Sequence, residues 1–155
     1  MNQAETRQQV EDLGRVFEKM GFTPMQGRIL AYLSAQGGEE KSFDEILQFF
    51  RTSKSTVSNS INYLLSSGLL DYRTRSGNRK RFFFLTARFP AAYIRMQEIL
   101  INAFKEQVYR ILSSQSPENR ENNSLIHQWI DFANRYGNYL TELKESALKS
   151  EEKKR

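Results

Sequence analysis

Small hydroxyl and amide side chains are concentrated between residues 53 and 63, which read Ser-Lys-Ser-Thr-Val-Ser-Asn-Ser-Ile-Asn-Tyr. The carboxamide of Asn59 can form paired hydrogen bonds with the edge of an adenine base. Small hydroxyl side chains let a helix approach a DNA groove closely, while Lys54 and the free N–H groups of a first helical turn can hold phosphate. The residues of this segment that we expect to contact DNA are Lys54, Ser55, Thr56, Ser58, Asn59, Asn62 and Tyr63.

A solvated helix surface is the alternative interpretation of the same residues. Ser, Thr and Asn are weak helix formers, however, and a surface selected only for stability would carry more Glu, Lys and Ala. The composition of residues 53–63 therefore favours contact with DNA.

A second group of chemically active side chains is basic. Between Arg51 and Arg88 the chain has eight Lys and Arg residues and one acid, Asp71, so this segment carries +7 and the rest of the chain −2. A concentrated basic patch favours a polyanionic partner, although RNA, an anionic lipid or water alone could also face it. Arg79 is the best candidate for minor-groove insertion, because narrow grooves attract Arg. The cations expected to reach DNA are Arg73, Arg75, Arg79, Lys80 and Arg81.

Residues suited to other kinds of chemistry are scarce. The chain has no Cys and a single His, His127, so we expect no disulfide, metal site or cofactor. No Ser-His-Asp set, carboxylate pair or Gly-rich phosphate loop stands out, which predicts a protein that is not an enzyme. The N-terminus is polar and no apolar run approaches the ~20 residues of a membrane span, so we expect a cytoplasmic protein without membrane contact.

The helices that position these residues can be predicted from caps and apolar spacing. An amphipathic helix is expected from about Glu5 to Met20. Residues 23–26 and 42–45 each form a capping box that opens a further helix. Ser53 caps a third helix from Lys54 to about Ser66. The apolar residues expected on its buried side are Val57, Ile61, Leu64 and Leu65.

A two-stranded hairpin is predicted after this helix. Residues 69–75 and 79–86 are rich in β-branched, aromatic and aliphatic residues, and Ser76-Gly77-Asn78 between them favours a turn. Phe82 and Phe84 share one strand face and are expected to anchor the hairpin to the core. Three short helices followed by a basic hairpin is the order of a winged helix-turn-helix domain, in which the third helix enters the major groove. We assign residues 22–88 to this domain.

Two long helices are predicted in the C-terminal part, from Pro90 to about Leu112 and from about Leu125 to Leu148. With residues 1–21 they carry more apolar surface than the winged-helix part can cover, and monomers avoid such patches. We therefore assign residues 1–21 and 89–150 to a dimerisation region and 151–155 to a frayed tail, in a mainly α (α+β) fold. The residues expected at the dimer interface are Leu100, Phe104, Val108, Ile111, Trp129, Ile130 and Leu140.

Several motifs resemble the GbsR branch of the MarR-type regulators. Residues 23–33, Thr-Pro-Met-Gln-Gly-Arg-Ile-Leu-Ala-Tyr-Leu, look like the start of its winged-helix domain, and Ser-Lys-Ser-Thr-Val-Ser at 53–58, ahead of Leu-Leu-Ser-Ser-Gly-Leu at 64–69, is similar as well. The wing sequence Gly-Asn-Arg-Lys-Arg at 77–81 is similar to the family's Gly-Asp-Arg-Arg pattern. It departs at Asn78, where many members have an Asp that commonly orients a wing Arg. The resemblance, which spans about residues 11–86, implies a dimeric bacterial regulator.

These observations predict a DNA-binding transcriptional regulator, a repressor that acts as a homodimer on a pseudo-palindromic operator. Some relatives sense small molecules, and Phe84, Phe89 and Tyr93 form the candidate site for a small apolar or cationic effector. A winged-helix adaptor for acidic proteins and a DNA-organising protein without an effector are the alternatives. Arg28 is expected in a structural ion pair, with Glu45 as its candidate partner.

Overall fold

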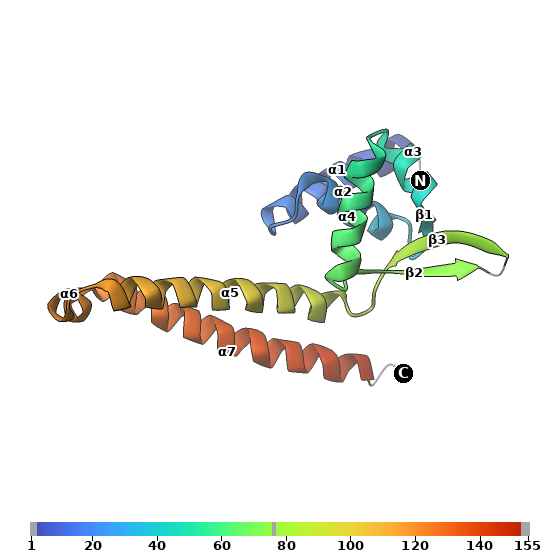
Figure 1. Cartoon of the computed structure of the whole chain (residues 1–155). Helices are drawn as coiled ribbons and strands as arrows, with labels where there is room; N and C mark the ends of the chain where they lie inside the picture. The colour runs from blue at the N-terminus through green and yellow to red at the C-terminus, as the bar shows by residue number, and fades with distance from the viewer. Residues whose placement is uncertain (1–2, 76, 153–155) are drawn as a thin grey trace. The chain divides into compact units, whose positions relative to one another are not determined.

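A computed structural model describes residues 3–75 and 77–152 of the chain (Figure 1). It divides into two compact units, residues 1–89 and 90–155. The first unit contains α1 (Gln3–Lys19), α2 (Pro24–Ala35), β1 (Lys41–Ser42), α3 (Phe43–Phe50), α4 (Lys54–Ser66), β2 (Leu70–Arg75) and β3 (Asn78–Leu85). The second contains α6 (Pro117–Asn122), α7 (Ser124–Glu152) and nearly all of α5 (Phe89–Ser114). The mainly helical winged-helix fold predicted from the sequence is confirmed.

The short helices of the first unit begin at the predicted caps. Ser42 and Glu45 form a reciprocal capping box at the start of α3, and residues 23–26 form another at the start of α2. At the start of α4, the Thr56 N–H donates to the Ser53 hydroxyl at 3.1 Å. These side chains satisfy N–H groups that have no partner inside the helix, which fixes where each helix starts.

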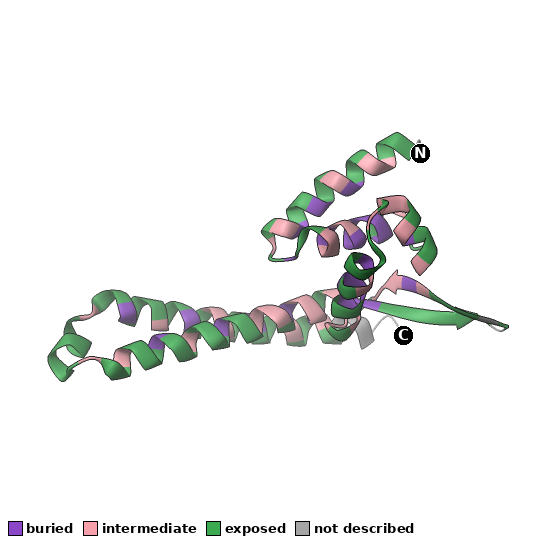
Figure 2. Ribbon diagram, turned by 45° about the horizontal axis from the view of Figure 1, so that its top comes forward, coloured by how far each residue is buried: buried purple, intermediate pink, exposed green. Residues whose placement is uncertain are grey.

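The core of the first unit contains three of the four apolar residues predicted on the buried side of α4, whereas the fourth, Leu65, is half-buried. Val57, Ile61 and Leu64 are buried there, together with Leu30 of α2 and Ile46 of α3. Buried residues line the inner faces of α2 and α4 in Figure 2, whereas the opposite face of α4 is exposed. Burial of one stripe thus leaves the polar stripe of α4 free to face a partner.

Helices α1 and α2 pack closely at two glycines. A Cβ atom on Gly27 would lie 2.8 Å from the carbonyl oxygen of Gly14. The Arg28 guanidinium then reaches α1, where it donates to both carboxylate oxygens of Glu11 at 2.9 and 3.0 Å and lies 3.6 Å from Glu18. The hydrogen bond from Arg28 lowers the pKa of Glu11.

The predicted ion pair between Arg28 and Glu45 is therefore wrong. The Glu45 carboxylate is occupied by the helix cap, since it accepts hydrogen bonds from the Ser42 N–H at 2.8 Å and from the Ser42 hydroxyl at 2.6 Å. Glu45 is thus engaged by the cap of its own helix. Because α1 packs closely on α2, Arg28 pairs with Glu11 and Glu18 of α1 instead.

The sheet has three antiparallel strands in the order β1-β3-β2. Strand β1 pairs through two residues only, with Ser42 opposite Phe82, so it is too short to leave a periodic pattern in the sequence. The sequence did not predict it. The hairpin of β2 and β3, called the wing below, pairs Leu70 with Leu85 and has an irregularity between Thr74 and Arg75.

The wing is anchored by Phe83, not by the predicted Phe82 and Phe84. Phe83 is 4% exposed, whereas Phe82 and Phe84 lie on the other strand face and are half-buried. Successive strand residues point to opposite faces, so the docking of the sheet on the helices decides which of two adjacent sets is buried. The prediction selected the wrong face.

In the second unit, α5 and α7 lie side by side as an antiparallel pair (Figure 1). Ile94 and Ile101 of α5 pack with Ala133 and Leu140 of α7. The Lys144 ammonium donates to both carboxylate oxygens of Glu98 at 2.7 and 2.8 Å. This apolar seam and its charged pair set the register of the two helices. No helix of the described ranges is long and apolar enough to cross a lipid bilayer.

Candidate nucleic-acid interface

The predicted DNA-contacting residues of α4 share its exposed side. Ser58 is the exception, because it is half-buried. The exposed stripe is called the reading face below, and its members are Lys54, Ser55, Thr56, Asn59, Asn62 and Tyr63. This helix therefore carries polar and apolar stripes on opposite sides, one for a partner and one for the core.

The first turn of α4 carries a cluster of hydroxyl groups. The Ser53 hydroxyl lies 2.7 Å from that of Thr56 and 3.0 Å from that of Ser55. The chain enters this turn through Arg51, which caps α3 with φ 51° and ψ 43° and is exposed. It is the one non-glycine residue with positive φ in the described ranges. Sequence reasoning did not select Arg51, although its position between two helices of a helix-turn-helix was a usable signal.

All five predicted wing cations are exposed, and three of them lie over aromatic rings. Such contacts are favourable and restrict the guanidinium to one orientation. From the guanidinium carbon to the ring centroid, Arg73 lies 4.9 Å from Phe84, Arg75 lies 4.1 Å from Phe82, and Arg81 lies 4.5 Å from Tyr72.

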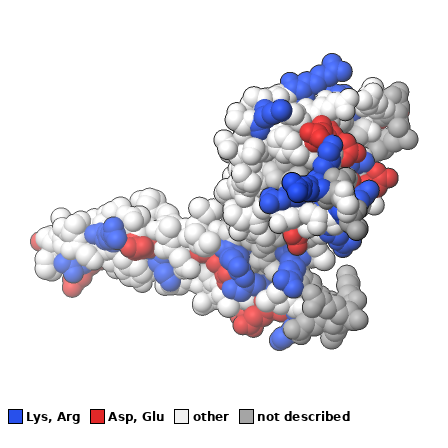
Figure 3. Space-filling model, turned by 45° about the vertical axis from the view of Figure 1, so that its right-hand side comes forward, with Lys and Arg blue, Asp and Glu red and all other residues white. Residues whose placement is uncertain are grey.

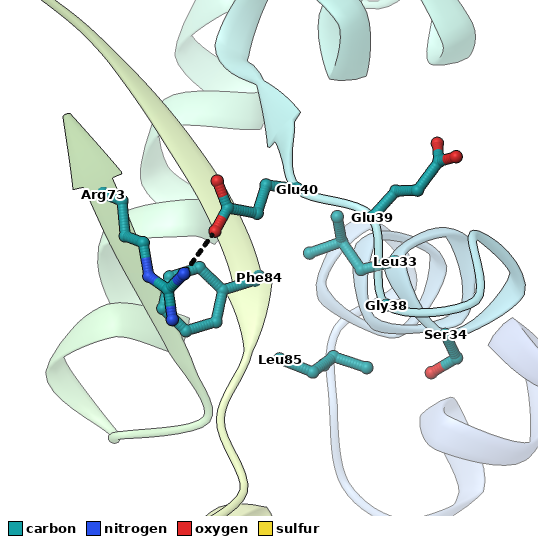
Figure 4. Close-up of a pocket in the computed structure, with 8 residues that line it drawn as sticks. All are labelled: Leu33, Ser34, Gly38, Glu39, Glu40, Arg73, Phe84 and Leu85. Carbon is teal, nitrogen blue, oxygen red and sulfur yellow. Dashed lines mark ion pairs between the residues drawn. The ribbon is translucent and has the colours of Figure 1, made fainter. Parts of the chain in front are cut away.

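Two of the wing cations also pair with acids outside the wing. Figure 4 shows Arg73 above Phe84 and directed towards Glu40, which it meets at 3.2 Å. The Lys80 ammonium donates to the Asp44 carboxylate of α3 at 2.9 Å, which lowers the pKa of Asp44 and raises that of Lys80. Arg79 has no ion pair or ring contact within the described residues.

A cavity brings the two predicted contact sets together. It has a volume of about 290 Å³, and it is lined by Ser58 and Asn62 of α4 and by Arg79 and Arg81 of β3, over an apolar floor that includes Phe83. Figure 3 turns the wing towards the viewer and shows Lys and Arg side chains gathered on it, beside several acids. The polar helix and the basic hairpin thus border one surface.

The three predicted effector residues have different surroundings. Phe84 lines a cavity of about 220 Å³ with Glu40 and Arg73 (Figure 4). Phe89 packs edge-on against Phe17 of α1, with ring centroids 6.3 Å apart. Tyr93 lies half-buried on α5, where burial raises its pKa. Their role as an effector site stays a prediction.

The predicted dimerisation residues divide into two sets. Val108 and Leu140 are 2% and 4% exposed, because they pack inside the second unit, and Ile130 is half-buried. Leu100, Phe104, Ile111 and Trp129 are exposed, and the rings of Phe104 and Trp129 are 6.0 Å apart. Further large apolar side chains exposed on the same two helices are Ile99, Tyr109, Leu125, Phe132, Tyr139, Leu143 and Leu148.

Residues 20–81 match the model of the MarR family. The matched segment contains α2, β1, α3, α4, β2 and the first part of β3, so it includes every predicted DNA-contacting residue. The match spans less than half of the chain, and it makes this winged-helix part similar to a MarR family domain.

One solved structure shares the fold over most of its length. A crystal structure of a transcriptional regulator is similar over 93% of this chain and 99% of its own, with a TM-score of 0.72 and 20% identity. Two variants of MepR are more distant, each with a TM-score of 0.43 over 77% of this chain. The first variant comes from a multidrug-resistant S. aureus clinical isolate and is 24% identical, with 81% of its own chain covered. The second is an S. aureus MepR variant bound to an oligodeoxyribonucleotide and is 22% identical, with 82% of its own chain covered. No curated protein gives a significant match.

Proposed function

We propose that this protein is a sequence-specific DNA-binding transcriptional regulator that acts as a repressor. The observation that supports this most strongly is the meeting of the reading face of α4 and the exposed cations of the wing at one surface, inside the segment that matches the MarR family. A helix with small polar side chains fits the major groove, and adjacent cations neutralise phosphates.

In this function each element has a separate task. Asn59, exposed near the middle of α4, reads a base edge through its carboxamide. Lys54 and the first-turn N–H groups of α4 hold a phosphate that fixes the register. Arg79 extends from the wing into the minor groove or onto its phosphates.

The protein acts as a homodimer through its second unit. Its exposed apolar residues on α7 lie at 125, 129, 132, 139 and 143, and together with the half-buried Tyr136 they follow alternating steps of four and three. This is the heptad spacing by which one helix packs against another, and it lies beside the stripe that already contacts α5. Leu100, Phe104 and Ile111 continue the apolar face on α5. A twofold dimer would cover it and present two α4 helices to a pseudo-palindromic operator.

A small apolar or cationic molecule modulates DNA binding. Such a molecule must bind one arrangement of the reading helices more tightly than another. Phe84 lines a cavity and so supports this part of the proposal. A ligand screen that shifts neither thermal stability nor operator affinity would count against it.

Selection of bound sequences from random duplex DNA, with the purified full-length protein, tests the proposed function. A symmetric motif with two half-sites is the expected result. Binding without any sequence preference would instead identify a DNA-organising protein. Absence of duplex binding, combined with binding to acidic proteins, would identify an adaptor.

A further inference from the structure

Asp44 is an acid placed among the cations that are predicted to contact DNA. It is the second residue of α3, and its carboxylate accepts a hydrogen bond from Lys80 of the wing at 2.9 Å. After Lys80, Lys54 is the other cation that lowers the pKa of Asp44. The carboxylate is therefore near the start of α4 as well as the wing.

This acid has no second partner in the described part of the chain. The neighbouring Glu45 carboxylate caps α3 through Ser42, whereas the Asp44 carboxylate accepts hydrogen bonds from Lys80 alone. The side chains of Asp44 and Lys80 are 67% and 60% exposed, so water and ions reach the pair. The ion pair can therefore open without disturbing the core. The ion pair of Arg73 differs, because its partner Glu40 is only 20% exposed and the Arg73 guanidinium also lies over Phe84.

A carboxylate at this position resembles the phosphate that the wing is expected to bind. Both are anions with oxygen acceptors for an ammonium group, and Lys80 cannot serve both at full strength. DNA that approaches the wing must displace Asp44 from Lys80 and also meets an uncompensated negative charge. Both effects oppose binding to any sequence, since they act on the phosphate backbone.

We propose that Asp44 is a specificity-determining residue, whose carboxylate competes with DNA phosphate for Lys80 and so limits sequence-independent affinity. This inference rests on the proposed function. Because contacts with the DNA phosphate backbone then contribute less, the base contacts of the reading face contribute a larger share of the binding free energy. The three neighbours Arg79, Lys80 and Arg81 therefore do not contribute equally to attraction for DNA.

The test compares full-length wild-type protein with Asp44→Asn, which keeps the size of the side chain and removes its charge. The operator found by selection and an unrelated duplex are each titrated at several salt concentrations. Exposed ion pairs contribute little, so Asp44→Asn should bind the unrelated duplex about two- to fivefold more tightly per half-site. Its plot of log affinity against log salt should become steeper by up to about one unit per half-site, because the Asp44 carboxylate no longer competes with phosphate for Lys80.

Two further variants identify the cause. In Asp44→Asn combined with Lys80→Ala the gain should disappear, because the released cation is absent. Glu39→Gln removes the same charge from an exposed acid that pairs with Lys41 and not with the wing, so it should leave affinity nearly unchanged. Circular dichroism checks that all variants are folded.

Three outcomes would overturn the inference. Unchanged or weaker binding by folded Asp44→Asn would mean that the pair positions the wing. If the gain in affinity persists when Asp44→Asn is combined with Lys80→Ala, or if Glu39→Gln produces the same gain, the effect comes from net charge alone. Failure of the wild-type protein to bind any duplex would overturn the proposed function together with this inference, and wild-type binding without the gain would overturn the inference alone.

Discussion

At the residue scale, the reading face separates side chains that can identify bases from side chains that only hold the backbone. Asn59 carries an amide that matches the edge of adenine, and it is exposed on α4 opposite the buried Val57 and Ile61. Lys54 and the wing cations offer charge, which acts on every sequence. The two groups should therefore respond differently to substitution.

Asn59→Ala should lower the affinity for the operator by ~1–3 kcal/mol and leave binding to an unrelated duplex nearly unchanged. The lost hydrogen bonds depend on the base, whereas the phosphate contacts remain. Titration of both duplexes at one salt concentration measures the difference. Asn102→Ala, the same change on exposed α5 surface, is the matched control. A folded Asn59→Ala that keeps full operator preference would place the reading contacts elsewhere.

Arg79→Ala and Lys80→Ala should differ although the residues are adjacent. Arg79 has no ion pair in the described residues, so its removal should flatten the dependence of log affinity on log salt by about one unit per half-site. Lys80 starts from an ion pair with Asp44, so its removal should flatten the dependence less. Salt titrations with one duplex measure both slopes. If Arg79→Ala leaves the slope unchanged, the hairpin is not a DNA-contacting wing.

At the scale of elements, the position of α1 on α2 depends on two glycines that allow a close approach. Gly14 and Gly27 are both buried, and Arg28 next to Gly27 binds Glu11 across the same contact. Gly137 on α7 is different, because the nearest atom to an added Cβ there would be 4.0 Å away. Replacement of glycine by alanine should therefore destabilise the protein at Gly27 and stabilise it at Gly137.

Gly27→Ala should lower the free energy of unfolding by ~1–3 kcal/mol, because the new methyl group meets backbone that cannot move cheaply. Gly137→Ala should raise it by roughly 0.5–1 kcal/mol, because Ala favours a helix and has room. Urea unfolding followed by circular dichroism measures both values. Equal stability of Gly27→Ala and wild type would show that α1 can shift away from α2.

At the scale of the whole molecule, the chain combines a unit with a formed core and a helical unit that leaves large apolar side chains exposed. In the second unit, the seam between α5 and α7 is already filled by residues such as Ile101 and Leu140. Other large apolar side chains stay exposed outside this seam, among them Phe104 and Trp129, whose rings lie 6.0 Å apart, and exposed apolar patches indicate a partner.

The full-length protein should sediment as a dimer at micromolar concentration, with an interface above ~1,000 Å². Leu100→Glu should shift it towards monomer, because a charge would enter the covered face while the seam between α5 and α7 remains intact. Leu100 is 62% exposed in one chain, so its replacement does not disturb the core of that chain. Asn102→Glu on the same helix is the matched control. Wild-type protein that sediments as a clean monomer would refute the dimer.

Features that depend on neighbours in the chain could be predicted from the sequence. The starts of α2, α3 and α4 follow from caps that close between residues three positions apart, such as Ser53 and Thr56. The buried stripe of α4 follows from helical spacing, and the wing follows from its turn residues and its change of period. The exposure of Asn59 and Arg79 follows from the same patterns.

Tertiary structure alone decided which distant residues meet. Lys80 and Asp44 are 36 positions apart, and Arg28 and Glu11 are 17 apart, so no local spacing relates them. The burial of Phe83 in place of its neighbours depended on which face of the wing docks, and the two residues of β1 became a strand because β3 lay beside them. Caps and amphipathic stripes are fixed by hydrogen bonds and burial within a few residues, whereas the partners of charges and strands are fixed only when separate elements pack.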